Sequence, residues 1–239
     1  MRPPLAAIAV TYKAVAKRRL WRRVLHGLRP ISLPGPSLKP STSLTRALRL
    51  RRTSREISEK RLSLQVISNL LWAACGVNRK KGPFGVSGRT AASASNSQEI
   101  DVYVALEEAT YLYDPFLHSL VPVAAGDHRR LAIGRGQPDT GGKAPIRLIF
   151  VADIDRLVNT RGFQEPGLHD ADVQRSYYCV DTGLIAANVY LFAAAIGLAA
   201  WFHNCDRSRI HATLHLKKEE RVLFGQTVGY PTQRTRERT

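Results

Sequence analysis

The amino-acid sequence predicts an α+β fold in which strands and helices do not alternate regularly. Three short strand patterns follow one another between residues 101 and 124. A long, largely apolar helix pattern then extends from about Asp170 to Ala199. A parallel α/β fold would require strict alternation of strands and helices, so these observations favour an α+β sandwich.

Two serine-capped helices open the part of the chain that has a folded pattern. Ser43 precedes a short helix that continues to Leu50, and Ser63 precedes a helix from Leu64 to Ala74. A serine side chain at this position accepts a hydrogen bond from a free amide of the first turn. Gly76 ends the second helix. The apolar faces consist of Leu44, Ala47 and Leu48 in the first helix and Val66, Ile67, Leu70, Leu71 and Ala74 in the second.

The remaining elements are read from hydrophobic periodicity and from turn residues. The expected order is strands over Asp101–Leu106, Ala109–Tyr113 and Ser119–Ala124, a short helix over Asp127–Ile133, a strand over Ile146–Ala152, the long helix, a helix over Arg207–Leu214 and a strand over Arg221–Val228. The run Ile146–Ala152 is typical of a strand at the centre of a sheet.

The second half of the long helix is apolar on nearly every side, which is typical of a buried helix or of a membrane span. Thr182–Phe202 contains 21 residues without a charge, a length that could cross a bilayer. Gly183, Asn188 and many alanines, with Asp181 at the boundary, favour a core or interface helix instead. We therefore expect no transmembrane span.

The positive charge of the chain is concentrated near its N-terminus. Residues 1–55 contain fourteen Lys or Arg and no acidic residue, whereas the rest contains 22 basic and 19 acidic residues. The prolines between Pro30 and Pro40 prevent a continuous helix there. We expect residues 1–40 to form a basic, poorly ordered arm and residues 41–239 to form the folded domain.

Composition also limits the class of protein. The apolar stretch Leu5–Val10 is short and precedes the basic cluster, so we expect no secretory signal and a cytoplasmic location. The arm could bind phosphate groups without specificity, but no motif indicates a specific nucleic-acid reader. Cys75, Cys179 and Cys205 have neither disulfide nor metal-ligand spacing, so we expect buried free thiols and no metal site.

Four motifs occur in a characteristic order: Arg51–Arg55, Ala92–Gln98, Asn188–Leu191 leading to Gly197-Leu198, and Val228–Pro231. Together they resemble the nitroreductase family of FMN-dependent oxidoreductases, in particular the branch that contains dehydrogenases of azoline-peptide biosynthesis. The resemblance covers about residues 41–231. It implies a three-layer sandwich with a mixed or antiparallel central sheet flanked by helices. It also implies a homodimer that forms through the long helix and holds FMN at each interface.

The resemblance assigns two groups of cofactor-binding residues. Arg51, Arg52, Thr53 and Arg55 match the family's cluster for the flavin phosphate and ribityl hydroxyls, and guanidinium groups suit phosphate well. Ser93, Ala94, Asn96 and Gln98 match a segment that reaches the flavin from the other subunit. Ala92 replaces the proline that is usual in this segment.

Four further residues complete the implied site: Asn188, Gly197, Leu198 and Arg234. Ala187 stands where the family often has glutamine. The segment Trp201–Cys205 is expected to pass close to the isoalloxazine ring. His203 within it could donate a proton, but a half-exposed strand residue is the preferred interpretation.

The implied activity is ping-pong hydride transfer through flavin N5. NADH, NADPH or an organic donor supplies the hydride, and an acceptor such as a nitroaromatic or a quinone takes the electrons. The cofactor carries the chemistry, so no catalytic side chain is expected. Two alternatives remain open, namely a dehydrogenase of peptide azolines or related heterocycles, and a basic-armed binding protein that has lost its flavin.

Overall fold

The computed structural model describes residues 27–37, 42–138, 142, 144–160 and 166–232. Seven strands form one sheet in the order β1-β6-β5-β4-β7-β9-β8, and all neighbours are antiparallel. These strands are β1 (Ile31–Ser32), β4 (Ile100–Ala105), β5 (Ala109–Asp114), β6 (Ser119–Ala125), β7 (Ile146–Asp153), β8 (Ala199–His203) and β9 (Glu220–Gly229). A separate hairpin joins β2 (Val77–Arg79) to β3 (Gly88–Arg89).

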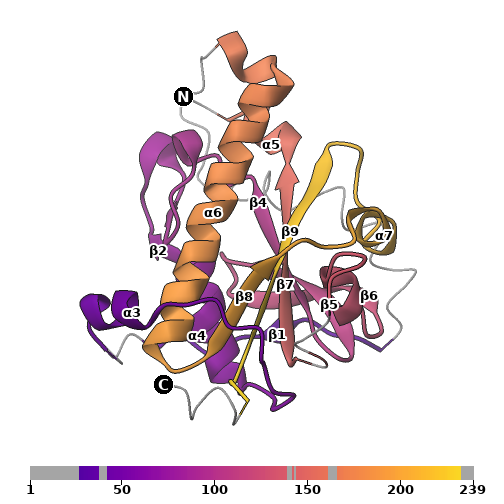
Figure 1. Cartoon of the computed structure of the whole chain (residues 1–239). Coiled ribbons are helices and arrows are strands. Elements are labelled where there is room, and N and C mark those ends of the chain that lie inside the picture. The colour runs from indigo at the N-terminus through magenta and orange to yellow at the C-terminus, as the bar shows by residue number, and fades with distance from the viewer. Residues whose placement is uncertain (1–26, 38–41, 139–141, 143, 161–165, 233–239) are drawn as a thin grey trace.

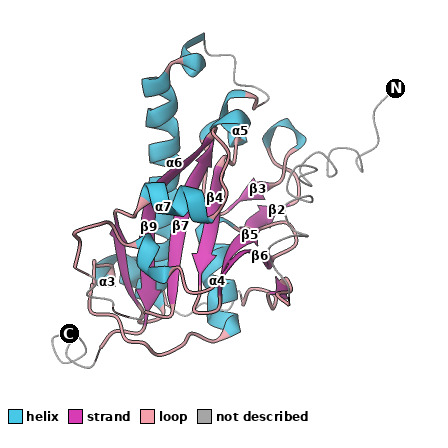
Figure 2. Ribbon diagram, turned by 90° about the vertical axis from the view of Figure 1, so that its right-hand side faces the viewer, coloured by secondary structure: helices cyan, strands magenta, loops and turns pink. Residues whose placement is uncertain are grey.

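Helices cover both faces of the large sheet (Figures 1 and 2). The α-helices are α3 (Leu44–Leu50), α4 (Leu64–Cys75), α5 (Ile154–Val158), α6 (Ala171–Ala195) and α7 (Arg207–Thr213), and the 3-10 helices are η1 (Pro83–Gly85), η2 (Ala94–Asn96), η3 (Arg129–Ala132) and η4 (Pro166–His169). Leu70 of α4 and Val189 of α6 belong to one buried cluster. Leu131 of η3 and Ile210 of α7 belong to a second cluster. Successive residues of β4 and β7 belong alternately to the first and the second cluster, so each face of the sheet packs against one cluster. The sheet is therefore the middle of three layers.

Local sequence signals explain where the helices begin. The Ser43 hydroxyl accepts a hydrogen bond from Arg46 N at 3.2 Å, and the Ser63 hydroxyl accepts one from Val66 N at 3.3 Å. Both predicted caps are confirmed, and each predicted strand lies within one residue of its expected bounds. The helix expected over residues 127–133 is shorter than predicted. Only Arg129–Ala132 adopt helical geometry, and they form the single 3-10 turn η3.

Helix α6 is long and apolar enough to cross a membrane. The core helix of a globular protein can have the same length and composition. The inner face of α6 packs against the sheet and α4, with Asp181, Thr182, Ile185, Ala186, Val189 and Ala193 buried. Val180 and Leu184 are exposed on its outer face. The helix ends at Ala195, four residues earlier than expected, because Gly197 turns the chain into β8 with a φ of +74°.

Residues 27–37 are attached to the domain, contrary to the expectation of a poorly ordered arm over residues 1–40. Ile31 and Ser32 pair with β6, and Leu33 is buried in the apolar core. The Ser68 hydroxyl donates a hydrogen bond to the carbonyl of Pro34. Prolines are tolerated here because an edge segment needs few amide donors. The rest of the expected arm, residues 1–26 and 38–40, lies outside the described residues.

Replacing Leu33 by alanine tests this attachment. We expect Leu33→Ala to lower the free energy of unfolding by about 2–3 kcal/mol, because it removes a buried leucine and leaves a cavity. Leu117, whose exposed fraction is 66%, provides the control, and Leu117→Ala should change stability by less than about 0.5 kcal/mol. Urea unfolding of both variants measures the difference, and equal stabilities would show that the segment adds nothing to the fold.

Two expectations about burial are wrong. Cys75 and Cys205 are buried as expected, but Cys179 is exposed on the outer face of α6. His203 is not half-exposed, because only 4% of it is accessible.

Candidate functional site

Segment 51–55 follows α3 and lies along the outer edge of β8. The amide of Ser54 donates to the carbonyl of Ala200 at 2.9 Å, and Thr53 Oγ1 lies 3.1 Å from Tyr190 Oη. The Tyr190 hydroxyl also accepts a hydrogen bond from the amide of Phe202 at 2.8 Å. Because β8 is the last strand of the sheet, its outward amides and carbonyls can hold this segment in place.

One cavity, of about 470 Å³, lies between segment 51–55 and the C-terminal end of α6. It is lined by Arg49, Arg51, Arg52, Tyr190, Pro231 and the turn 197–200, among others, and we call it the arginine cavity. Within the described part of the chain, no carboxylate forms an ion pair with any of its three arginines. Three guanidinium groups without an acidic partner favour an anionic ligand, phosphate above all.

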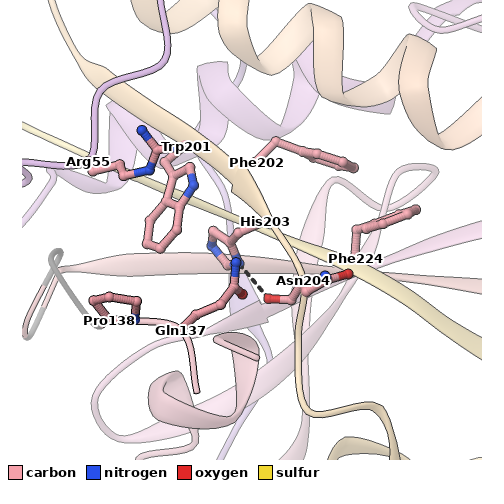
Figure 3. A pocket seen from close by; sticks show the side chains of 8 residues that line it. All are labelled: Arg55, Gln137, Pro138, Trp201, Phe202, His203, Asn204 and Phe224. Atoms are coloured by element: carbon pink, nitrogen blue, oxygen red, sulfur yellow. Dashed lines mark hydrogen bonds between the residues drawn. The ribbon is translucent and has the colours of Figure 1, made fainter. Parts of the chain in front are cut away.

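A second cavity, of about 490 Å³, begins at the other end of segment 51–55, and we call it the aromatic cavity. Its lining consists of Arg55, Gln137, Pro138, Trp201, Phe202, His203, Asn204 and Phe224 (Figure 3). The Arg55 guanidinium lies 5.6 Å from the centre of the Trp201 ring, and the Phe202 and Phe224 rings are 4.9 Å apart. Aromatic walls with a few polar groups are typical of sites for flat organic ligands.

Both ring nitrogens of His203 have hydrogen-bond partners. Its Nδ1 donates to the carbonyl of Asn204 at 2.9 Å, and its Nε2 lies 2.8 Å from Thr227 Oγ1. The carbonyl can only accept, which places the ring hydrogen on Nδ1. With both nitrogens engaged, His203 supports the wall below Trp201, whose ring centre is 4.5 Å away, and is not placed to donate a proton.

The segment 134–138 borders the aromatic cavity. The amide of Gly134 donates to the carbonyl of Asn204 at 2.9 Å, and Arg135 Nε lies 2.7 Å from a carboxylate oxygen of Asp206. The hydrogen bond and charge of Arg135 lower the pKa of Asp206. Gln137 then lines the cavity.

The other predicted binding segment, Ser93–Gln98, forms a tight loop before β4, which we call loop 93–98. Ser95, Asn96 and Gln98 have φ values of +46°, +57° and +53°. Residues other than glycine adopt this left-handed region only at a cost in free energy. Gln98 Nε2 donates to Asn96 Oδ1 at 2.8 Å, so the side chains of the loop help to hold this conformation.

The sequence model of the nitroreductase family matches residues 48–230 of this chain. The chain belongs to the nitroreductase family. This confirms the resemblance of the four motifs, and it places the chain among oxidoreductases.

Relatives of this nitroreductase-family chain agree with the assignment. A Methanocaldococcus jannaschii protein named as a candidate nitroreductase is 31% identical over 155 residues, which are 62% of this chain and 71% of that protein. A crystal structure of a candidate nitroreductase from Ralstonia eutropha is 35% identical, with a TM-score of 0.75 over 88% of this chain and 93% of that one. A chain of the Escherichia coli microcin synthetase complex shares the fold, with a TM-score of 0.60, 20% identity, and coverage of 92% and 84%.

The predicted cofactor residues of the family form two separate groups in one chain. Arg51, Arg52, Gly197 and Leu198 line the arginine cavity, Thr53 contacts Tyr190, and Arg55 lines the aromatic cavity. Ser93, Ala94, Asn96 and Gln98 lie in loop 93–98. Asp181, which accepts a hydrogen bond from the Ala94 amide, and Ala193, which lines the arginine cavity, are twelve residues apart on α6, about 18 Å along its axis. The described part of one subunit therefore does not bring the two groups together.

Two predicted residues belong to neither group. Asn188 Nδ2 donates to the carbonyl of Thr90 at 3.3 Å and lies 3.5 Å from the carbonyl of Ala74. These contacts join α6 to α4 and to the segment before loop 93–98. Arg234 lies outside the described residues.

Several site residues were not predicted. Tyr190 belongs to the Asn188–Leu191 motif, but the resemblance assigns only Asn188 of this motif to the site. Arg49 lies in the last turn of α3, two residues before Arg51, so its closeness to the predicted arginines in the sequence could have indicated it. Gln137 and Phe224 reach the aromatic cavity from distant segments, and nothing in the local sequence marks such residues.

Proposed function

We propose that this chain is an FMN-dependent oxidoreductase. In this proposal hydride passes between NADH, NADPH or an organic donor and an acceptor such as a nitroaromatic or a quinone. The observation that carries it is that one short segment, 51–55, contributes lining residues to both the arginine cavity and the aromatic cavity. FMN combines a phosphate, with about two negative charges, and a flat ring system. The two cavities offer a matching surface for each part.

The residues fit the cofactor as follows. Arg49, Arg51 and Arg52 would bind the phosphate through charge-assisted hydrogen bonds. Arg55 and Trp201 would border the ring system, and the apolar wall would keep water away from the reacting face. The bound flavin would supply the hydride chemistry, so the chain has to bind and orient the flavin and shield its reacting face from water.

A homodimer would complete this site. Leu44, Leu48 and Leu50 of α3 and Val180 and Leu184 of α6 are large apolar residues that are exposed in the single chain, and α3 packs against α6. An exposed apolar patch of this kind is typical of a protein–protein interface. A second subunit could also bring its own loop 93–98 to a cavity that the same loop of the first subunit does not reach.

A related reaction is the second candidate. The fold is shared with a chain of the E. coli microcin synthetase complex over 92% of this chain. This likeness favours testing whether a peptide azoline, or a similar heterocycle, acts as the hydride donor. A loss of flavin absorbance under anaerobic conditions with such a substrate, but not with NAD(P)H, would select this reaction.

The visible absorption spectrum of the purified protein is the first test. We expect flavin bands, and we expect FMN to be released when the protein is denatured. Anaerobic addition of NADH or NADPH should then bleach these bands, which identifies the donor. A protein that stays colourless after incubation with FMN would exclude the proposal and favour a nitroreductase-like fold without flavin.

A further inference from the structure

Two buried carboxyl groups meet behind loop 93–98. Asp181 of α6, with an exposed fraction of 4%, accepts a hydrogen bond from the Ala94 amide at 2.9 Å. Glu99 has an exposed fraction of 0% and accepts a hydrogen bond from the Ser97 hydroxyl at 2.6 Å through Oε2. The two carboxyl groups lie near each other, since the charge of Glu99 acts on Asp181. The pair therefore contacts the loop at two points, Ala94 and Ser97.

The burial of both acids favours one proton held between them. Glu99 Oε1 is buried and lacks a hydrogen-bond donor among the described residues. A carboxylate has no hydrogen to donate, so the neighbouring Asp181 could supply this donor only in its protonated form. Burial, and then the charge of Glu99, raise the pKa of Asp181 to about 7, as expected for two buried acids at one place.

Among the described residues, no cation forms an ion pair with either of the two carboxyl groups. Of the arginines around the loop, Arg156 donates to both carboxylate oxygens of Asp101 and to the carbonyl of Gln98. Arg89 donates to the side-chain oxygen of Gln98 at 2.6 Å. Helix α4, which packs beside α6, contributes no charged residue. Glu99 is thus the group whose charge acts directly on Asp181.

The loop needs such support because three of its residues are in the left-handed region. Each of Ser95, Asn96 and Gln98 costs free energy in this conformation and keeps it only when surrounding contacts impose it. Asp181 and Glu99 hold the loop by accepting hydrogen bonds from Ala94 and Ser97. Arg156 and Arg89 hold the loop by donating hydrogen bonds to Gln98.

We propose that Asp181 and Glu99 are positioning residues that share one proton and thereby fix loop 93–98 in the conformation that binds flavin. The flavin part of this inference rests on the proposed function, whereas the shared proton does not. Loss of the proton would place two negative charges side by side and loosen the loop. Since Asp181 titrates at a higher pH in the folded chain than its ordinary value of 3.8, its contribution to stability is complete at low pH and is lost as the pH rises through about 7.

Neutral substitutions of the same shape distinguish a shared proton from a required charge. In Asp181→Asn, the amide can donate to Glu99 and its oxygen can still accept from Ala94. Glu99→Gln offers the reciprocal arrangement. Asp181→Ala removes the partner of the Ala94 amide and leaves Glu99 Oε1 without the proposed donor, which is costly for buried groups. Asp172→Asn is the matched control, because Asp172 is an exposed aspartate in the first turn of the same helix.

Two measurements are needed. Flavin-fluorescence titration gives the Kd for FMN at about pH 6 and about pH 8.5, on either side of the titration. Hydrogen exchange of the Ala94 amide, measured without flavin, reports the loop alone. At about pH 6 we expect Asp181→Asn and Glu99→Gln to stay within about threefold of wild type in Kd, and Asp181→Ala to bind at least about tenfold more weakly. Wild type and Asp172→Asn should lose affinity and Ala94 protection at the higher pH, whereas Asp181→Asn should lose less of both.

Loss of affinity and protection in Asp181→Asn equal to that in Asp181→Ala would overturn the inference. The same holds if wild type and Asp181→Asn show the same pH dependence. The phosphate of FMN titrates equally in every variant, so it cancels from the comparison. If no variant binds FMN, the proposed function fails, and the exchange of the Ala94 amide still decides whether the pair shares a proton.

Discussion

Replacing Leu184 by glutamate is expected to convert a dimer into a monomer and to abolish tight FMN binding. Leu184 lies on the outer face of α6 with an exposed fraction of 40%, so the substitution leaves the core of each subunit intact. A twofold interface would contain the new charge twice, and each unpaired buried charge costs about 3–5 kcal/mol. The dimer dissociation constant should therefore rise by more than about a thousandfold.

Light scattering coupled to size-exclusion chromatography measures this change. Leu117→Glu is the control, because Leu117 is also exposed but lies in the turn between β5 and β6, away from α3 and α6. This control should remain dimeric and yellow. A wild-type chain that is monomeric at micromolar concentration, or a Leu184→Glu variant that remains dimeric, would contradict the proposed interface.

The double substitution of Arg51 and Arg52 by glutamine should weaken FMN binding about 100-fold. Each arginine would lose a hydrogen bond to a charged phosphate, and such bonds contribute about 1.5–3 kcal/mol. Two of them correspond to at least about 3 kcal/mol, or roughly two powers of ten in Kd. Titration of the intrinsic flavin fluorescence measures the affinity directly.

Two controls separate phosphate binding from a general effect of charge. Arg46→Gln removes an arginine on α3 that does not line either cavity, and it should leave the affinity nearly unchanged. Riboflavin lacks the phosphate, so the wild type and the double variant should bind it equally. An equal loss for riboflavin and FMN would place the arginines away from the phosphate.

Much of the secondary structure could be predicted because its signals are local. The caps of α3 and α4 depend on a serine and an amide three residues later. The bounds of β4, β5, β6, β7 and β9 follow from short apolar runs between turn residues. Such signals lie within a few residues of the feature that they predict, so one sequence is sufficient to read them.

Other features could not be predicted because they depend on contacts between distant segments. The proline-containing segment around Leu33 belongs to the domain because β6 and Ser68 lie beside it. Leu44 and Leu48 share a helical face with Ala47, yet only Ala47 is buried in the single chain. Periodicity gives the face of a helix but not the element that covers it.

The same distinction between local signals and distant contacts applies to the candidate site. The sequence by itself determined the family, and it predicted the arginine segment 51–55 and loop 93–98 as binding segments, because each is a short run of residues with a recognisable composition. Only the tertiary structure decided that Tyr190 holds the arginine segment, that His203 is buried, and that Asp181 and Glu99 meet behind the loop. These contacts join residues far apart in the chain, and hydrogen bonding and burial at such distances are fixed only when the sheet and α6 pack together.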